Sequence, residues 1–150
     1  MSQHLHRRYS RVVSLDIQPT SARPIKADLE VLPFRDGRFD LIVCLDVLEH
    51  VKDDFAAMRE RWRVLTPDGV GLIHVPLSYI EGPIRTPEEL GTPFYHGTSK
   101  VYREYNRDGM LKSLGEAGLA VGEMTYPDDE LEIGPSNPKG LLTLFVCRKG

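Results

Sequence analysis

Two strand-like runs of this sequence lead to an aspartate, a residue whose ionised side chain can accept hydrogen bonds from two hydroxyl groups. Residues 11–17 form a β-branched run with Asp16 near its end, and residues 39–45 form a nearly continuous apolar run followed by Asp46. A third run, residues 70–75, ends at Pro76. Ligands of open α/β sheets gather outside the carboxyl ends of the parallel strands. The three run ends therefore predict a ligand site at one rim of a sheet.

Two helices are expected between these runs and after them. Asp53 and Asp54 favour the start of a helix, where acidic side chains interact well with the helix dipole. An apolar stripe at helical spacing follows and is expected to face the core: Phe55, Met58, Trp62 and Leu65. The turn-forming residues 66–69 should stop this helix before the run at 70–75. Asn106 is the expected cap of a second helix that ends near Gly118.

The order of elements predicts an α/β protein with a Rossmann-like, three-layer sheet. Strands alternate with helices up to residue 118, and two consecutive strands, 119–125 and 141–147, then place an antiparallel strand at the C-terminal edge. The run at 39–45 does not alternate, which is typical of a strand buried on both faces of a parallel sheet. We expect one domain over residues 1–150.

Within this domain, residues 11–75 form the half that holds the ligand. Residues 76–105 are rich in proline and glycine and carry four tyrosines, and a connection this long is typical of a lid over a binding site. Residues 106–150 supply the second helix and the two C-terminal strands.

Composition excludes several classes of protein. Hydrophobic residues make up 41% and charged residues 27% of the 150 positions, values that argue against disorder, collagen, a coiled coil or a disulfide scaffold. The net charge of -3, without a block of like charge, gives no footprint for nucleic acid or an anionic membrane. The longest apolar runs have the length of strands, and residues 1–8 are too polar for a signal peptide. We therefore expect neither a nucleic-acid nor a membrane partner.

The two cysteines, Cys44 and Cys147, lie inside apolar runs and are interpreted as buried thiols of a protein in the reducing cytoplasm. The sequence has no CxxC motif and no Cys/His cluster with zinc spacing. His4 and His6 beside the N-terminus are weak evidence for a metal, and no metal site is predicted.

Three segments in order resemble class I S-adenosylmethionine (SAM)-dependent methyltransferases of the small-molecule type. They read LPFRDGRFD at residues 32–40, LDVLEHV at 45–51 and RVLTPDG at 63–69. Residues 102–105 (YREY) and 114–118 (LGEAG) are similar to the family's approach to its sixth strand. The resemblance covers about residues 11–148 and implies a methyltransferase that uses SAM as its cofactor.

The resemblance assigns cofactor contacts residue by residue. Asp16 matches the acid that holds the ribose hydroxyls of SAM, and Ile17 would pack on the adenine. Asp28 matches the residue that meets the adenine amino group, with Ala27 and Leu29 beside it. Three residues match the rim beneath the methionine part of the cofactor: Leu45, Asp46 and Val47.

Three histidines follow these rim residues in the sequence, and one of them is a candidate for catalysis. Glu49 and His50 match the LEH motif and are interpreted as structural residues of the strand-to-helix connection. His74 falls within a strand and is interpreted as a core or face histidine. His96, in the expected lid, is the candidate general base, because the ordinary pKa of histidine lies near neutral pH.

Three further residues in or next to the expected lid are candidates for substrate binding. They are Tyr79, Tyr102 and Arg103. An arginine there would suit a substrate carboxylate or phosphate, and the aromatic side chains suit a small or amphipathic organic acceptor.

The family's first strand and its glycine-rich turn have no counterpart in this sequence, whose first glycine is Gly37. The first strand of the family lies between the second and the fourth, so its loss should leave two rows of backbone groups unpaired. Residues 11–17 would then pair directly with residues 39–45, a second chain would donate a strand, or the domain would be marginally stable. Direct pairing and a homodimer are the favoured outcomes.

Two functions remain open at this point. The first is transfer of a methyl group from SAM to a small-molecule acceptor. The second is a non-catalytic remnant that kept the fold and acts as an interaction or dimerisation module. Asp16 and Asp28 favour the first, and the absent glycine-rich turn favours the second.

Overall fold

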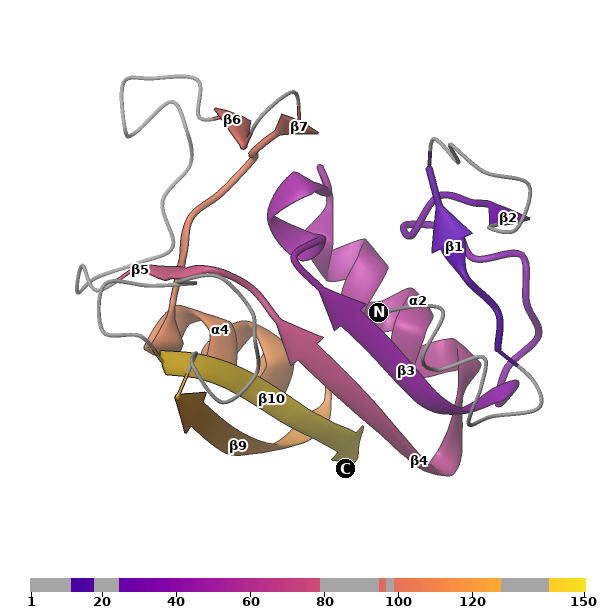
Figure 1. Ribbon diagram of the computed structural model, residues 1–150. Helices are drawn as coiled ribbons and strands as arrows, with labels where there is room; N and C mark the ends of the chain where they lie inside the picture. The colour runs from indigo at the N-terminus through magenta and orange to yellow at the C-terminus, as the bar shows by residue number, and fades with distance from the viewer. Residues whose placement is uncertain (1–11, 18–24, 79–94, 97–98, 128–140) are drawn as a thin grey trace.

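A computed structural model describes residues 12–17, 25–78, 95–96, 99–127 and 141–150 (Figure 1). Its main sheet has four strands in the order β3-β4-β10-β9. Their bounds are Phe39–Leu45 (β3), Leu65–His74 (β4), Leu119–Pro127 (β9) and Leu141–Lys149 (β10). β3 and β4 are parallel, whereas β10 is antiparallel to both of its neighbours. The predicted α/β class with an antiparallel C-terminal edge is confirmed.

Two capped helices follow the predicted pattern. α2 (Asp54–Val64) connects β3 with β4, and the Asp53 side chain caps it by accepting the Ala56 N–H at 2.8 Å. α4 (Arg107–Glu116) precedes β9, and the Asn106 side chain accepts the Gly109 N–H at 2.7 Å. Both caps satisfy backbone donors that the first helical turn leaves unpaired.

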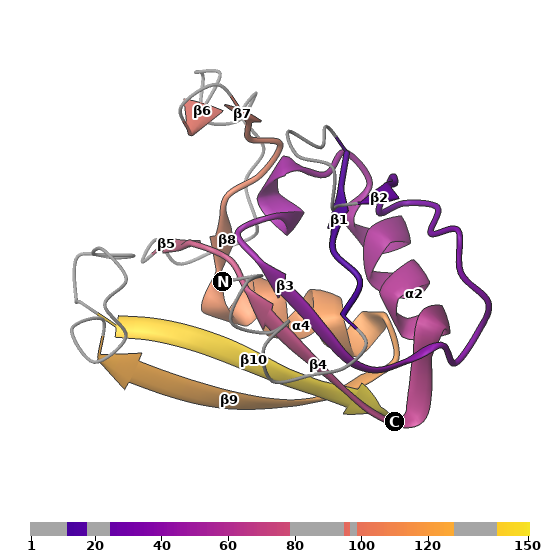
Figure 2. The ribbon, with the colours of Figure 1, turned by 45° about the vertical axis from the view of Figure 1, so that its right-hand side comes forward.

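Both helices pack on the same face of the sheet (Figures 1 and 2). Their buried residues form one cluster with the sheet residues Ile73 and Phe145. A side chain at Gly71 would meet the Trp62 ring at 3.0 Å, so glycine lets α2 approach β4 closely. Within the described part of the chain no helix covers the opposite face. The predicted three-layer arrangement is thus seen here as its sheet and one helical layer.

β4 begins earlier than expected. The sequence predicted a turn at residues 66–69, but the chain passes from Val64 directly into an extended Leu65. The Arg38 N–H donates to the Val64 carbonyl at 2.6 Å, and Phe39 already pairs with Leu65. A register shift between Phe39 and Leu41 then accommodates the proline-containing segment inside the strand.

The N-terminal strands form a separate small sheet. β1 (Leu15–Asp16) pairs in parallel with β2 (Ile25–Lys26), and β1 is the described part of the strand expected at residues 11–17. The predicted direct pairing of residues 11–17 with β3 is wrong, because β1 pairs with β2 and the outer edge of β3 has no strand beside it among the described residues.

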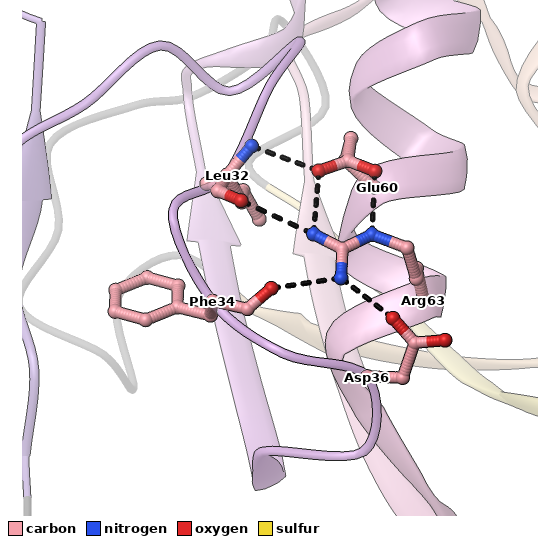
Figure 3. Close-up of polar contacts among 5 residues, drawn as sticks. All are labelled: Leu32, Phe34, Asp36, Glu60 and Arg63. Carbon is pink, nitrogen blue, oxygen red and sulfur yellow. Dashed lines mark hydrogen bonds and ion pairs between the residues drawn. The ribbon is translucent and has the colours of Figure 1, made fainter.

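The connection between β2 and β3 is fastened to α2 by hydrogen bonds (Figure 3). Arg63 donates to the carbonyls of Phe34 and Leu32 at 2.7 and 3.1 Å and to the Asp36 carboxylate at 2.7 Å. Glu60 binds Arg63 at 2.7 Å and accepts the Leu32 N–H at 2.8 Å.

Four short strands and one helical turn complete the described elements. β5 (Leu77–Ser78) pairs in parallel with β8 (Tyr105–Asn106), and β6 (Tyr95–His96) pairs with β7 (Ser99–Lys100). A 3-10 turn, η1 (Leu48–His50), follows β3. Most of the expected lid lies outside the described residues, and the domain boundaries stay a prediction. No helix in the described ranges is long and apolar enough to cross a membrane.

Candidate active site

The carboxyl ends of β3 and β4 bring an aspartate and a histidine into contact. Leu45 pairs with His74, and the next backbone N–H, that of Asp46, donates to the His74 carbonyl at 3.1 Å. Asp46 has a positive φ of 53°, which is uncommon for a residue other than glycine. Its Oδ1 lies 2.8 Å from Nδ1 of His74. The Asp46 side chain is 59% exposed and that of His74 only 7%.

The LEH turn places a second carboxyl group, that of Glu49, near this pair. Glu49 is buried, and neither of its carboxyl oxygens has a hydrogen-bond partner among the described residues. Burial raises the pKa of Glu49, and the nearby charge of Asp46 adds to the effect. Nε2 of His50 lies 3.7 Å from Glu49 Oε1, while Nδ1 of His50 contacts the Lys100 carbonyl at 2.7 Å. The described residues contain no cluster suited to a metal ion.

Arg103 binds the segment that connects η1 with α2. Its guanidinium donates to the carbonyls of Val51 and Lys52 at 2.7 and 2.6 Å and forms an ion pair with Asp54 at 3.3 Å. The Tyr105 hydroxyl also donates to Asp54, at 2.5 Å. Burial, followed by the Asp54 charge, raises the pKa of Tyr105. This network gives Arg103 a structural role and does not support its predicted contact with substrate.

The other lid residues are placed only in part. The Tyr102 N–H donates to the Glu49 carbonyl at 2.7 Å, and Lys100 Nζ lies 4.5 Å from the centre of the Tyr102 ring. Tyr79 lies outside the described residues. The backbone of His96 belongs to β6, and its side chain is not described. The roles predicted for Tyr79 and His96 therefore stay predictions.

The β1–β2 unit groups the residues predicted for the adenosine half of SAM. Ala27 is buried, and its N–H donates to the Asp16 carbonyl at 3.1 Å, which brings the segment from Ala27 to Leu29 beside the end of β1. The Asp16 and Asp28 side chains are exposed, and Ile17 is 61% exposed. Hydrogen-bond acceptors beside an exposed apolar side chain suit ribose hydroxyls and an adenine ring. The hydrogen-bond acceptors and the exposed apolar side chain of these residues thus fit the adenosine half of the cofactor.

The rim residues lie on the other part of the site. Leu45 and Val47 are half-buried and flank Asp46 at the end of β3. In both views of the ribbon the arrows of β1 and β3 point toward the same end of the molecule (Figures 1 and 2). The two groups of predicted cofactor residues therefore lie at the carboxyl ends of their strands, as expected.

Sequence reasoning missed the contact made by His74. It was interpreted as a core or face histidine because it falls within an apolar strand. The available signal was its position at the carboxyl end of a strand parallel and adjacent to the one that ends before Asp46. The positive φ that turns Asp46 toward His74 could not have been inferred from the sequence.

Comparisons with known proteins show that this chain is similar to methyltransferases. Residues 1–73 match the model of a methyltransferase domain family. The chain is 29% identical over 117 residues to the malonyl-[acyl-carrier protein] O-methyltransferase of Geobacter sulfurreducens, covering 75% of this chain and 42% of that protein. It is 34% identical over 92 residues to the ubiquinone/menaquinone biosynthesis C-methyltransferase UbiE of Psychromonas ingrahamii, covering 61% and 31%. The chain thus spans less than half the length of these relatives.

A solved structure extends the similarity to the fold. The 1,6-didemethyltoxoflavin-N1-methyltransferase of Burkholderia thailandensis, determined with S-adenosylhomocysteine bound, superposes with a TM-score of 0.60 at 19% identity and covers 85% of this chain and 51% of that one. Together the matches confirm the resemblance to class I SAM-dependent methyltransferases. The three named proteins methylate oxygen, carbon and nitrogen respectively, so the similarity does not fix the acceptor atom.

Proposed function

We propose that this chain binds SAM and contributes the catalytic site of a methyltransferase for small-molecule acceptors. The observation that carries the proposal is the pairing of β1 with β2, which places Ala27 and Asp28 beside Asp16 at the end of β1. The family match over residues 1–73 and the bound S-adenosylhomocysteine of the Burkholderia enzyme support the choice of cofactor.

Each part of the site has a distinct task in this proposal. Asp16 holds the ribose hydroxyls, Asp28 accepts from the adenine amino group, and Ile17 packs on the ring. The rim at Asp46 and Val47 lies under the methionine half. When bound, SAM supplies a methyl group carried on a positively charged sulfur. The rim then positions the acceptor in line with that methyl, which accounts for much of the rate in reactions of this kind.

Titration calorimetry of the chain with S-adenosylhomocysteine tests the proposal. We expect saturable binding that Asp16→Ala weakens at least about tenfold, because hydrogen bonds to a charged group contribute roughly 1.5–3 kcal/mol. Asp68→Ala, which removes an exposed carboxylate from β4, is the matched control and should bind like the original chain. Absence of binding by a folded chain, or equal binding by Asp16→Ala, would contradict the proposal.

A cytoplasmic location is part of the same proposal. Cys44 and Cys147 are both free and buried. Burial raises the pKa of the Cys147 thiol to about 12, which keeps it protonated and unreactive. Such thiols are compatible with a reducing compartment.

Among the described residues no strand pairs with the outer edge of β3, and this edge favours a second function, that of an interaction or dimerisation module. β3 is seven residues long and apolar at most positions, and exposed edges of this kind are templates for pairing with another strand. A homodimer built on this edge would have twice the chain mass in solution, which sedimentation measures directly. A monomer at high concentration would exclude it.

A further inference from the structure

The geometry points to His74 as the general base of the proposed methyl transfer, with Asp46 as the residue that positions it. The inference rests on the proposed function and deepens it by naming the class of acceptor. The acceptor class is one that must lose a proton when it is methylated, as a hydroxyl group does. An acceptor that is already ionised would need no base.

The contact between the two side chains fixes which ring nitrogen is available. Asp46 Oδ1 lies 2.8 Å from Nδ1 of His74, and an ionised carboxylate can only accept a hydrogen bond. Nδ1 of a neutral ring therefore carries the proton, and Nε2 keeps its lone pair. A carboxylate that orients a histidine in this way leaves the other nitrogen ready to accept a proton from a nucleophile.

The backbone holds the pair rigidly. The Asp46 N–H donates to the His74 carbonyl, and β4 is paired on both sides, by β3 and by β10. Asp46 adopts its φ of 53° at the place where its side chain meets the histidine. Uncommon backbone conformations of this kind cluster at active sites, where the surrounding structure stabilises them.

The position of the pair suits an acceptor rather than the cofactor alone. Asp46 belongs to the rim predicted to lie beneath the methionine half of SAM. β4 follows β3 in the sheet, and in both ribbon views β1 and β2 lie on the side of β3 away from β4 (Figures 1 and 2). A base on β4 would therefore lie on the side of the rim away from the proposed adenosine half.

The step balances without a further reactant. Nε2 of His74 takes the hydroxyl proton of the acceptor, and the oxygen lone pair forms the new bond to the methyl carbon. The carbon–sulfur bond breaks, and its electron pair stays on sulfur, which becomes neutral. The imidazolium that remains is stabilised by Asp46 and returns its proton to solvent.

Nitrogen-15 NMR of histidine-labelled protein tests the pair without a known substrate. We expect the neutral His74 ring to carry its proton on Nδ1, the nitrogen that faces Asp46. Asp46→Asn should move the population toward the Nε2–H tautomer that free histidine prefers, and asparagine tolerates a positive φ. His50→Asn is the matched control and should leave the His74 signals unchanged. A proton on Nε2 in the original chain would overturn the inference.

Methyl transfer to phenol and to iodide separates a base from a structural residue, because iodide has no proton to lose. His74→Asn keeps an amide donor for Asp46 but cannot accept the proton. We expect it to lower the rate with phenol about 10²–10⁴-fold and to leave the rate with iodide unchanged. Equal losses with both acceptors, or transfer to iodide without transfer to phenol in the original chain, would overturn the inference.

Calorimetry with S-adenosylhomocysteine keeps the two proposals distinguishable. If the original chain binds and His74→Asn binds equally well, the cofactor site is intact and the acceptor rates decide the role of His74. If the original chain binds but methylates neither acceptor, the base assignment is overturned and the cofactor site stands. If the folded chain does not bind, the proposed function itself fails.

Discussion

The two halves of the candidate site differ sharply in how the fold supports them. The rim at Asp46 and His74 belongs to a four-stranded sheet, and the fully buried Phe145 lies in the core of that sheet. The adenosine half belongs to β1, β2 and the segment that follows β2. β1 and β2 pair over two residues, and Ile25 in β2 is 44% exposed and Val31 after it 74% exposed.

The proposed ligand site thus joins two regions that differ in how much of their apolar surface is buried. A region with few buried apolar contacts opens at a lower free-energy cost than the core of a sheet. Ligand binding should therefore order the β1–β2 unit more than the β3–β4 rim. Each of the following predictions changes one side of the contrast.

The largest effect is expected in the main sheet. Phe145→Ala removes a ring that is fully buried against both helices, and we expect the free energy of unfolding to fall by about 3–5 kcal/mol. Val31→Ala in the β1–β2 unit is the matched control and should change it by less than about 0.5 kcal/mol. Urea unfolding measures both. Similar losses for the two variants would remove the contrast.

A smaller loss is expected at the buried phenol of Tyr105. Tyr105→Phe deletes the hydroxyl that donates to Asp54, a bond to a charged group that contributes about 2 kcal/mol. Tyr102→Phe should be close to neutral, because the described contact of its ring with Lys100 does not use the hydroxyl. Thermal unfolding of both variants is the measurement, and a Tyr105→Phe protein as stable as the original would contradict the network.

Glu49 should make stability depend on pH. Burial raises the pKa of Glu49 in the folded chain above its unfolded value, so the folded state holds more protons between the two pKa values. The Glu49 contribution is fully present below the unfolded pKa and is lost as the pH rises through the folded pKa. Glu49→Gln cannot ionise, so its stability relative to the original chain should improve as the pH rises. Urea unfolding at about pH 4 and pH 8 tests this sign. A difference that is constant with pH would contradict it.

The smallest effect on overall stability is expected at the anchor of the β2–β3 connection. Arg63→Gln removes the donors to Leu32, Phe34 and Asp36, which hold this connection against α2. We expect faster amide hydrogen exchange in residues 32–38 with little change in the exchange of β4. Arg148→Gln, at an exposed position of β10, is the control. Unchanged exchange in residues 32–38 would show that the anchor does not restrain them.

The sequence predicted the elements whose signals are local. The cap residues Asp53 and Asn106 and the apolar run of β3 were located correctly, because capping and hydrophobic patterning act within a few residues. The partner of β1 was not, since strand pairing joins residues that are distant in the sequence and has no local signal.

The site shows the same limit. The positions of Asp16 and Asp46 followed from the family motifs. The contact between Asp46 and His74 joins residues 28 positions apart and depends on the register of β3 with β4. The hydrogen bonds of Arg103 show the same limit, and the binding role predicted for it stays a prediction. An arginine in a loop looks available in the sequence, and only the fold shows the carbonyl oxygens that surround it.

Amide hydrogen exchange with and without S-adenosylhomocysteine tests most directly whether the two regions form one site. We predict ligand-dependent protection in peptides that cover residues 12–17 and 25–31, with a smaller change at residues 45–50, where the rim is already held by the sheet. At the same ligand concentration, Asp16→Ala should lower the protection in all three peptides. Protection confined to one region, or none in a folded chain, would contradict the account.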